Sequence, residues 1–515
     1  MEKKREGSFK FLDTVERIGN KLPHPIAMFG ILAIVTVLLS WVLSTMGVSV
    51  VGEVMNKEGV LEEKTFTVVN LLSRSGIAWM LTNVVSNFTS YAPLGTVLIA
   101  MVGIGMADGS GYITALLKKA LASTPPKMIA PMLVFLGIMA NVSSDAGYVI
   151  VVPIGMMIMH SVGRHPLAGF AATMAGVSGG YSANLIVTSI DPQLAALSTE
   201  AAAIVDPNYV VNPTANWWFM IVSTLLLTVV GTLVTEKIIE PRLGKYEGEA
   251  AADTGMTSLS DKESHALKSA NIALLLTVVF VVACAIPQNS FLRNEKTGSL
   301  LMGSPLMNGV TPLISIAFFI VGVVYGKKAG LFHNHRDVCK EMGKTMSSMG
   351  SYLALAVVAS QFIKYFNYTN IGNLISIAGA DFLSKMNINP ILLILCFILF
   401  CAFMNLLMAS ATAKWTLLAP IFVPMFMKLG LSPELTQAAY RVADSSTNII
   451  SPVMAYLAVM ITFAQRYEKN AGIGTVWSLM LPYCIGFIAS WAVLLIIWML
   501  GGWELGPAAL PFLAA

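Results

Sequence analysis

The sequence predicts an all-α polytopic membrane protein with nine transmembrane helices and two opposed re-entrant helical hairpins in an inverted repeat. Three observations favour this class. The 515-residue chain is 56% hydrophobic and only 12% charged, whereas roughly 25% of residues are charged in soluble domains. Apolar runs long enough to cross about 30 Å of hydrocarbon recur along the chain. Two further apolar segments are interrupted by polar residues near their centres.

Nine apolar runs have the length expected of a membrane span. They cover residues 25–46, 91–107, 166–190, 216–235, 270–286, 305–325, 346–365, 433–463 and 474–500. The N-terminal segment has basic residues but no short apolar region with a small-residue cleavage site, and the first apolar run is long enough to span, so we expect a retained helix and not a signal peptide.

The segments 129–159 and 391–427 are each too long for one ordinary span. They carry NVSSDAGY (141–148) and ASATAKW (409–415) near their centres. One interpretation is a single kinked helix with a buried Ser/Thr patch. The other, which we favour, is a re-entrant hairpin whose non-helical tip is tolerated where protein or a watery cavity satisfies its backbone.

An internal repeat supports two hairpins. A shift of 267 residues aligns the first hairpin and its following helix with the second pair, and over the 36 positions from 143 to 178 nine residues are identical, including Pro153/Pro420 and Pro166/Pro433. Paired hairpin and helix units of opposite orientation are typical of secondary transporters with a binding site near the membrane midplane.

The distribution of Lys and Arg predicts the orientation. Basic residues cluster before the first span, in 237–268 and in 327–344, whereas 191–214 contains none. We therefore expect the N-terminus inside, the C-terminus outside, and hairpins opening to opposite sides. The predicted organisation is a cytoplasmic N-terminus (1–24), a first membrane half (25–235) with hairpin 129–162, a cytoplasmic linker (236–268), and a second half (269–515) with hairpin 390–429.

Ionisable residues inside apolar segments are the strongest functional candidates, because a charge in the bilayer centre is costly unless it is paired or faces water. Arg441, Asp444 and Asn448 are spaced i, i+3, i+7 and share one helix face. One interpretation is a local ion pair between Arg441 and Asp444. The other is that Asp444, Asn448 and Asn405 supply oxygens to a sodium ion, while Arg441 meets an anionic group of a substrate.

The first half offers similar chemistry. The hairpin tip contains Asn141, Ser143, Ser144 and Asp145, and the following segment places Asn184, Thr188 and Asp191 at i, i+4, i+7. These residues predict a second oxygen-rich site, with Asn141 and Asn184 as candidate cation ligands. Ser144, Asp145 and Asp191 are candidate substrate contacts. For the hydroxyl groups, ordinary contacts between helices are the alternative.

The tip of the second hairpin adds Thr412, Lys414 and Trp415 beside the predicted helix break. Trp415 is a candidate to stack on a planar ligand, although aromatic residues near the ends of membrane helices are often interfacial anchors. Pro433 follows Ser432 in the pattern of a helix start.

Several classes of function lack their sequence features. The net charge of +4 is small, so we expect no nucleic-acid partner. The five cysteines show no metal-ligand spacing, and no GxxxxGK[ST], HExxH or GxSxG motif is present. An intramembrane enzyme using Asp145 and Asp444 would lack a metal or nucleophile partner. We therefore predict a non-enzyme without a cofactor, coupled to sodium or protons.

Short motifs spread along the chain carry a family resemblance. They are VERIGNKLPHP (15–25), APLG (92–95), SSDA (143–146), VGRHPLAG (162–169), LSTEAAA (197–203), KIIEPRLG (237–244), IPQN (286–289), LAPIFVPMFM (418–427), RVADSS (441–446) and LPY (481–483). In these motifs the chain resembles the p-aminobenzoyl-glutamate transporter family, AbgT, over almost its whole length. The resemblance implies a dimeric secondary carrier of the bacterial inner membrane, coupled to sodium or protons. Some relatives import p-aminobenzoyl-glutamate and others are linked to sulfonamide efflux.

The resemblance also implies functional residues. It points to Trp415, Pro433, Arg441, Asp444 and Asp191 around the substrate, and to Asn405, Asp444 and Asn448 as sodium ligands. Thr412 stands where the family often has Ser, and Lys414 where we would expect a small or neutral residue.

Two hypotheses follow for the function. The first is an ion-coupled transporter, acting as a homodimer in the lipid bilayer, for small anionic aromatic amides of the aminobenzoyl-glutamate type. In it Arg441 pairs with a substrate carboxylate, Trp415 packs on the ring, and Asp444, Asn405 and Asn448 hold the cation. The second is an exporter that removes sulfonamides by proton antiport.

Overall fold

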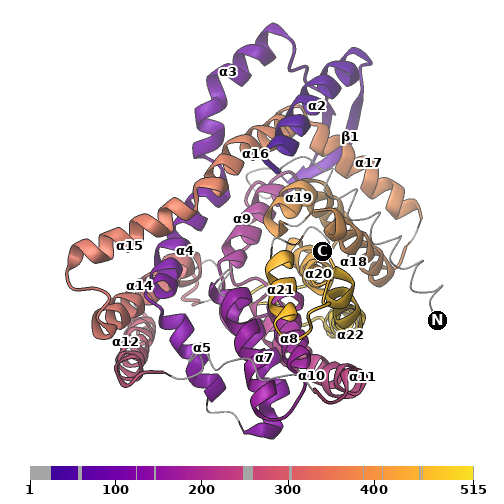
Figure 1. Cartoon of the computed structure of the whole chain (residues 1–515). Helices are drawn as coiled ribbons and strands as arrows, with labels where there is room; N and C mark the ends of the chain where they lie inside the picture. Colours follow the sequence, from indigo (N-terminus) through magenta and orange to yellow (C-terminus); the bar gives the residue numbers. More distant parts are fainter. Residues whose placement is uncertain are drawn as a thin grey trace, which may run out of the picture.

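The protein is mostly helical, with one two-stranded sheet among the described residues (Figure 1). The computed structural model describes residues 25–55, 61–122, 125–143, 147–246, 259–300, 304–386, 388–408, 410–451, 454 and 456–513. The predicted cytoplasmic segment 1–24 lies outside these residues, as do Ser144 and Asp145 of the first hairpin tip.

The sheet is a feature that the all-α prediction did not include. Strands β1 (Ser49–Met55) and β2 (Leu61–Thr67) pair antiparallel with Ser49 opposite Thr67. They follow α2 (Pro25–Thr45) and precede α3 (Arg74–Thr89). β-Branched residues favour strands in SVVGEVM and LEEKTFT, but a scan for long apolar runs does not detect such short amphipathic strands.

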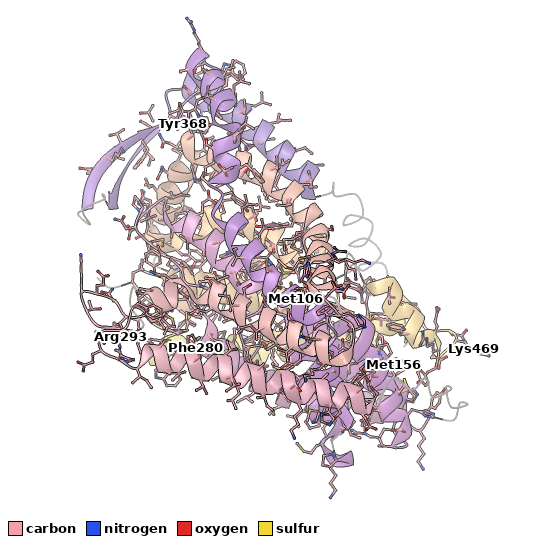
Figure 2. The ribbon with its side chains drawn as sticks, turned by 90° about the vertical axis from the view of Figure 1, so that its left-hand side faces the viewer. Met106, Met156, Phe280, Arg293, Tyr368 and Lys469 are labelled. Atoms are coloured by element: carbon pink, nitrogen blue, oxygen red, sulfur yellow. The ribbon has the colours of Figure 1, made fainter. Side chains whose placement is uncertain are left out.

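Six of the described helices are long and apolar enough to cross a membrane, or seven if the bent pair α15 (His335–Ser348) and α16 (Gly350–Tyr368) is one span. The six are α2, α10 (Trp217–Val234), α12 (Asp261–Ala285), α14 (Val310–Ala329), α18 (Pro390–Leu407) and α22 (Ile473–Gly501). Phe280 on α12 is 69% exposed (Figure 2), as expected of a side chain that faces lipid. The chain is therefore a multi-pass membrane protein.

The first half contains several shorter helices around the centre of the molecule. They are α4 (Ala92–Gly109), α5 (Tyr112–Ala122), α6 (Ile129–Met139), α7 (Val152–Ser161), α8 (Pro166–Met174) and α9 (Ile190–Ala202), with 3-10 turns η1 (Pro126–Met128) and η2 (Ala140–Ser143) and π-helical turns η3 (Gly147–Val151) and η4 (Ala175–Gly179). A π-helical turn, η5 (Thr235–Ile239), and α11 (Glu240–Leu243) continue α10.

The remaining helices of the second half are α13 (Pro305–Asn308), α17 (Ile371–Lys385), α19 (Ala411–Met427), α20 (Pro433–Asn448) and α21 (Leu457–Gln465). Helices α12, α14 and α15 form the left flank in Figure 1, whereas α17, α18 and α19 lie on the right. The hydrophobic core continues between the two halves, through α6, α8, α9, α19, α20 and α22.

Four of the nine predicted spans are interrupted, two of them by a single residue, Gly309 in 305–325 and Met349 in 346–365, and two by longer breaks. In 166–190 the helix ends after η4, and residues 180–189 are not helical. In 433–463, α20 ends at Asn448 and α21 begins at Leu457. Hydropathy did not reveal these breaks because apolar residues continue through them. Non-helical backbone at membrane depth needs polar partners from the protein, so these breaks direct attention to the side chains around them.

Glycine allows close approach beside the first break. A Cβ added to Gly137 of α6 would lie 2.7 Å from the carbonyl oxygen of Thr173 and 2.9 Å from the Cα of Gly176. The two backbones therefore touch where any side chain would separate them, as small residues permit in membrane helix packing.

Candidate functional site

The non-helical segment 180–189 is held by side chains from distant elements. The carbonyl oxygen of Ser182 accepts a hydrogen bond from Nη2 of Arg441 at 2.8 Å, and the Ser182 amide donates to Oγ of Ser445 at 3.0 Å. The Leu185 carbonyl accepts from Nε1 of Trp217 at 2.9 Å. Helices α20 and α10 thus supply hydrogen-bond partners that this backbone would otherwise lack, because it is not helical.

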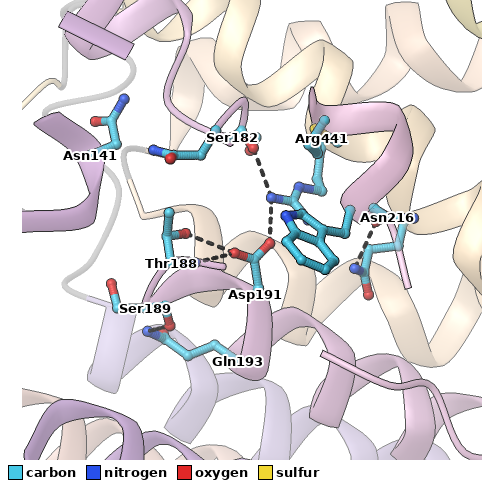
Figure 3. Close-up of polar contacts among 12 residues, drawn as sticks. Asn141, Ser182, Thr188, Ser189, Asp191, Gln193, Asn216 and Arg441 are labelled. Atoms are coloured by element: carbon cyan, nitrogen blue, oxygen red, sulfur yellow. Dashed lines mark hydrogen bonds and ion pairs between the residues drawn. The ribbon is translucent and has the colours of Figure 1, made fainter. Parts of the chain in front are cut away.

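Asp191 and Arg441 form a buried ion pair between the two halves of the chain (Figure 3). Nη2 of Arg441 lies 2.6 Å from Oδ1 of Asp191. The other carboxylate oxygen of Asp191 accepts from the amide of Thr188 at 2.5 Å and from its hydroxyl at 2.9 Å. Asp191 lies in the first turn of α9, where the helix dipole favours negative charge. The carboxylate therefore has a fixed orientation toward Arg441.

This ion pair lies at one wall of a small cavity with a volume of about 10 Å³, room for about one water molecule. Polar atoms of the lining come from Asp191, Arg441, Ser182 and Asn184, and the rest from Ile186, Val187, Pro213, Trp217 and Met220. Nε of Arg441 has no hydrogen-bond partner among the described residues. The site therefore combines a guanidinium having a free donor with apolar and aromatic surface.

A second ion pair joins α19 to α20 at Asp444, three residues after Arg441. Nζ of Lys414 is 2.5 Å from Oδ1 of Asp444, and each side chain is only 1% exposed. Lys414 also donates to Oδ1 of Asn405. Nδ2 of Asn405 in turn donates to the Asp444 carbonyl, to Oγ1 of Thr447 and to Oδ1 of Asn448, at 2.6 to 2.8 Å.

The three predicted sodium ligands are thus brought together, but their oxygens face N–H donors. Asn405 and Asp444 each direct one side-chain oxygen to Lys414, and Asn448 directs its oxygen to the amide of Asn405. Only Oδ2 of Asp444 lacks a hydrogen-bond partner within this set. Hard cations require several oxygen ligands, so the described arrangement does not fit a sodium ion.

Trp415 lies in a chain of buried polar groups and not on the cavity wall. Its ring stacks on Tyr440 with centroids 4.6 Å apart, and its Nε1 donates to Oγ of Ser198 at 3.0 Å. Ser198 donates to Oε1 of Gln437, and Gln437 donates to Oδ1 of Asn216, at 2.7 and 2.9 Å. In this conformation the ring of Trp415 and its indole N–H both already have protein partners.

The other predicted residues occupy separate places. Oγ1 of Thr412 donates to Gln193, and Pro433 begins α20 after the N-cap Ser432. Asn141 and Asn184 both donate to the Ile138 carbonyl, at 3.1 and 3.2 Å, so they lie close together near the first hairpin. Their role as cation ligands stays a prediction.

Arg441 pairs with Asp191 and not with Asp444 among the described ion pairs. The alternative of a local pair within α20 is therefore wrong in this conformation. The i, i+3 spacing could not distinguish the two partners, because Asp191 lies 250 positions away in the sequence.

Several residues at the site were not predicted. They are Ser182, Gln193, Ser198, Asn216, Trp217, Gln437 and Tyr440. One signal could have identified Gln437, because Gln437, Arg441 and Asp444 continue the polar stripe on one face of α20. The partners from other helices required the tertiary packing.

Comparison with known proteins identifies the family. The AbgT transporter family model matches residues 10–513. The chain belongs to the AbgT family. It is 37% identical to the p-aminobenzoyl-glutamate transport protein of Escherichia coli (strain K12) over 507 residues, 98% of each chain.

Two solved structures of transporters are similar to this AbgT chain. The Alcanivorax borkumensis YdaH transporter is 39% identical, with a TM-score of 0.88 over 94% of this chain and 100% of that one. Neisseria gonorrhoeae MtrF, described with a class of antimetabolite efflux pumps, is 42% identical, with a TM-score of 0.90 over 95% of this chain and 97% of that one. Family and relatives are transporters, which agrees with the prediction of a non-enzyme.

Proposed function

We propose that this AbgT-family chain is an ion-coupled secondary transporter of small anionic aromatic amides of the p-aminobenzoyl-glutamate type across the bacterial inner membrane. The observation that carries the proposal is the buried Arg441 guanidinium, fixed by Asp191 at the wall of the cavity, with Nε free of protein partners. A carboxylate is one of the groups that a guanidinium binds through strong, charge-assisted hydrogen bonds. The printed name of the Escherichia coli relative agrees with this substrate class.

The cavity supports distinct roles for its residues. Arg441 would bind a substrate carboxylate through its free edge, and Trp217 with Met220 would contact the aromatic ring. Contact between Trp415 and the ring, as the sequence predicts, requires Tyr440 or Ser198 to move away. The cavity volume of about 10 Å³ is far below the roughly 300–1,000 Å³ of ligand pockets. Alternating access would therefore enlarge the cavity before the whole ligand enters.

The complete architecture that we propose has nine spans and two opposed hairpins. Equivalent contacts in the repeat support it: Nδ2 of Asn184 donates to the Ile138 carbonyl, and Oγ of Ser451 donates to the Asn405 carbonyl. Each residue of the second contact lies 267 positions after its counterpart, which is the shift that aligns the repeat in the sequence.

The proposed orientation has the N-terminus inside and the C-terminus outside. Segments predicted to be cytoplasmic contact one another, as in the Arg164–Glu240 ion pair and the packing of Tyr246 on Tyr467. Segments predicted to be external also contact one another, as in the hydrogen bond from the Ser432 amide to the Pro511 carbonyl. Arg293, predicted outside, and Lys469, predicted inside, lie at opposite edges in Figure 2.

Sulfonamide efflux is the second candidate function. It is favoured by the similarity to MtrF, which is described with antimetabolite efflux pumps. A sulfonamide shares an aromatic amine with p-aminobenzoyl-glutamate but lacks the glutamate carboxylates. The two functions therefore differ in how far they depend on Arg441. A homodimer is also proposed, from the family resemblance, and cross-linking in membranes would test it.

Uptake and efflux of labelled p-aminobenzoyl-glutamate in proteoliposomes test the proposal, with sodium and pH gradients imposed separately. We expect movement under an ion gradient, and its loss in Arg441→Gln. Arg242→Gln is the matched control, because Arg242 donates to the Ser478 carbonyl at an exposed position. Absence of movement under either gradient with folded protein would contradict this substrate. Sulfonamide resistance of a sensitive host expressing the chain would then favour efflux.

A further inference from the structure

Lys414 is unusual among the charged residues of this protein. Of the described Lys and Arg side chains, only Lys414 and Arg441 are buried. Arg441 faces the cavity, whereas Lys414 does not contribute to its lining. An ammonium at such depth is costly unless its charge and its hydrogen bonds are satisfied. Its partners should therefore explain its presence.

The partners of Lys414 are the side chains predicted to bind a coupling cation. Its Nζ lies between Oδ1 of Asp444, at 2.5 Å, and Oδ1 of Asn405. Asn405 is held in place by its own bonds to Thr447 and Asn448. A carboxylate and an amide oxygen around a single positive charge are the ligands that a sodium ion would use. Here the positive charge is attached to the chain.

The charges at the Arg441 and Asp444 positions of α20 also balance without a free ion. Asp444 is paired with Lys414, and Asp191 is paired with Arg441. A sodium ion added to this set would leave one uncompensated positive charge in a buried region, which is unfavourable. In the repeat, Lys414 aligns with Gly147 and Asp444 with Val177, so the pair has no counterpart in the first half.

We propose that the ammonium of Lys414 is the resident cation of the Asp444 site and takes the place that sodium would occupy. Transport by this chain then needs no sodium ion at that site. Because the charges there are already balanced, we expect the proton to be the coupling ion. This inference deepens the proposed function, because it rests on the chain being an ion-coupled carrier. It differs from the assignment of Asn405, Asp444 and Asn448 as sodium ligands.

The first test measures sodium binding without substrate. The thermal stability of the purified full-length protein in detergent is compared in sodium and potassium chloride of equal ionic strength. We expect no sodium-specific change in the wild type and a saturable stabilisation in Lys414→Ala, where the ammonium is removed. Sodium about a hundredfold above its Kd would raise the ratio of folded to unfolded protein about a hundredfold.

A matched control removes a different, partly buried ion pair. Lys364 lies 2.8 Å from Glu200, so Lys364→Ala changes the net charge equally but leaves the Asp444 site unchanged. It should gain no response to sodium. If Lys414→Ala does not fold, Lys414→Gln, which keeps a donor for Asn405, replaces it. The wild-type measurement, compared with that of Asp444→Asn, decides independently of both Lys414 variants.

Specific outcomes would overturn the proposal. One is a saturable, sodium-specific stabilisation of the wild type that Asp444→Asn abolishes. Another is a folded Lys414→Ala protein that gains no response to sodium. In proteoliposomes, wild-type uptake of p-aminobenzoyl-glutamate should be equal in sodium and potassium buffers. Absence of any uptake would contradict the proposed substrate alone, because the stability measurements still decide whether Lys414 replaces sodium.

Discussion

The guanidinium of Arg441 on α20 is joined to the carboxylate of Asp191 on α9 by an ion pair of 2.6 Å that bridges the two halves of the chain. The same nitrogen also donates to the Ser182 carbonyl in the non-helical segment between η4 and α9. One side chain therefore connects three elements of the site, and its charge is balanced by a carboxylate from the other half.

Asp191→Asn should both destabilise the protein and abolish transport. It leaves the buried Arg441 without a counter-charge, and breaking such a pair costs about 3–5 kcal/mol. The double variant Asp191→Asn with Arg441→Met should recover much of the stability but no transport. Thermal unfolding in detergent and uptake in proteoliposomes measure the two effects. Normal uptake by the double variant would exclude a role of this pair in substrate binding.

Trp415→Phe and Trp415→Ala should differ strongly in stability. Phe keeps most of the ring on Tyr440 but loses the bond to Ser198, which costs about 1 kcal/mol. Ala opens a cavity in the core, at about 3–5 kcal/mol. Ser198→Ala combined with Trp415→Phe forms a double-mutant cycle. Strict additivity of the two changes in thermal stability would show that the bond contributes nothing.

Gly176→Ala should destabilise the contact between η4 and α6. The new Cβ would overlap the Val134 carbonyl, and overpacking of this kind costs typically about 1–3 kcal/mol. Gly343→Ala on α15 is the control, because a Cβ at Gly343 meets nothing within 4 Å. In thermal unfolding, Gly176→Ala should unfold at a clearly lower temperature than Gly343→Ala. Equal stability would argue against close backbone contact.

The stability of the protein should fall at acidic pH through His165, which lies in the turn before α8. Burial lowers the pKa of His165 below its ordinary value of 6.5, against an opposing effect of Glu468. Its neutral Nδ1 accepts from the Leu167 amide at 3.1 Å, and a protonated ring could not. A lowered pKa in the folded state means that stability is present above about pH 6.5 and is lost as pH falls through the folded value.

The variant His165→Asn isolates this effect. Asn is a good N-cap and does not titrate in this range. The measurement is thermal unfolding between roughly pH 5 and pH 8, an interval that includes the ordinary pKa of His. Stability should fall less toward acidic pH in the variant than in the wild type. Parallel profiles would assign the decline to other groups.

The sequence was sufficient to locate the long helices and the candidate charges. The runs at 25–46, 216–235 and 474–500 correspond closely to α2, α10 and α22, because long apolar stretches have few alternatives to a buried or membrane helix. The prediction that Asn405, Asp444 and Asn448 lie together also agrees with their contacts. Spacing along α20 was enough for two of them.

The pairing of charges could not be predicted in the same way. Asp191 and Arg441 meet only because the helix unwinds after Gly179 and α9 turns toward α20. Lys414 was noted as a departure from the family, but its approach to Asp444 depends on the angle between α19 and α20. Periodicity within one helix carries no information about such contacts between elements.

The matching contacts of Asn184 with Ile138 and of Ser451 with Asn405 have a consequence for the history of the chain. The inverted repeat that we propose implies an internal duplication, which begins with two identical halves, yet the positions equivalent to Lys414, Arg441 and Asp444 are Gly147, Met174 and Val177. The hydrogen bond to a backbone carbonyl was therefore kept in both halves, whereas the charged residues were not. The halves have become complementary and no longer interchangeable, since a chain assembled from two copies of either one would lack the opposite charges that join them.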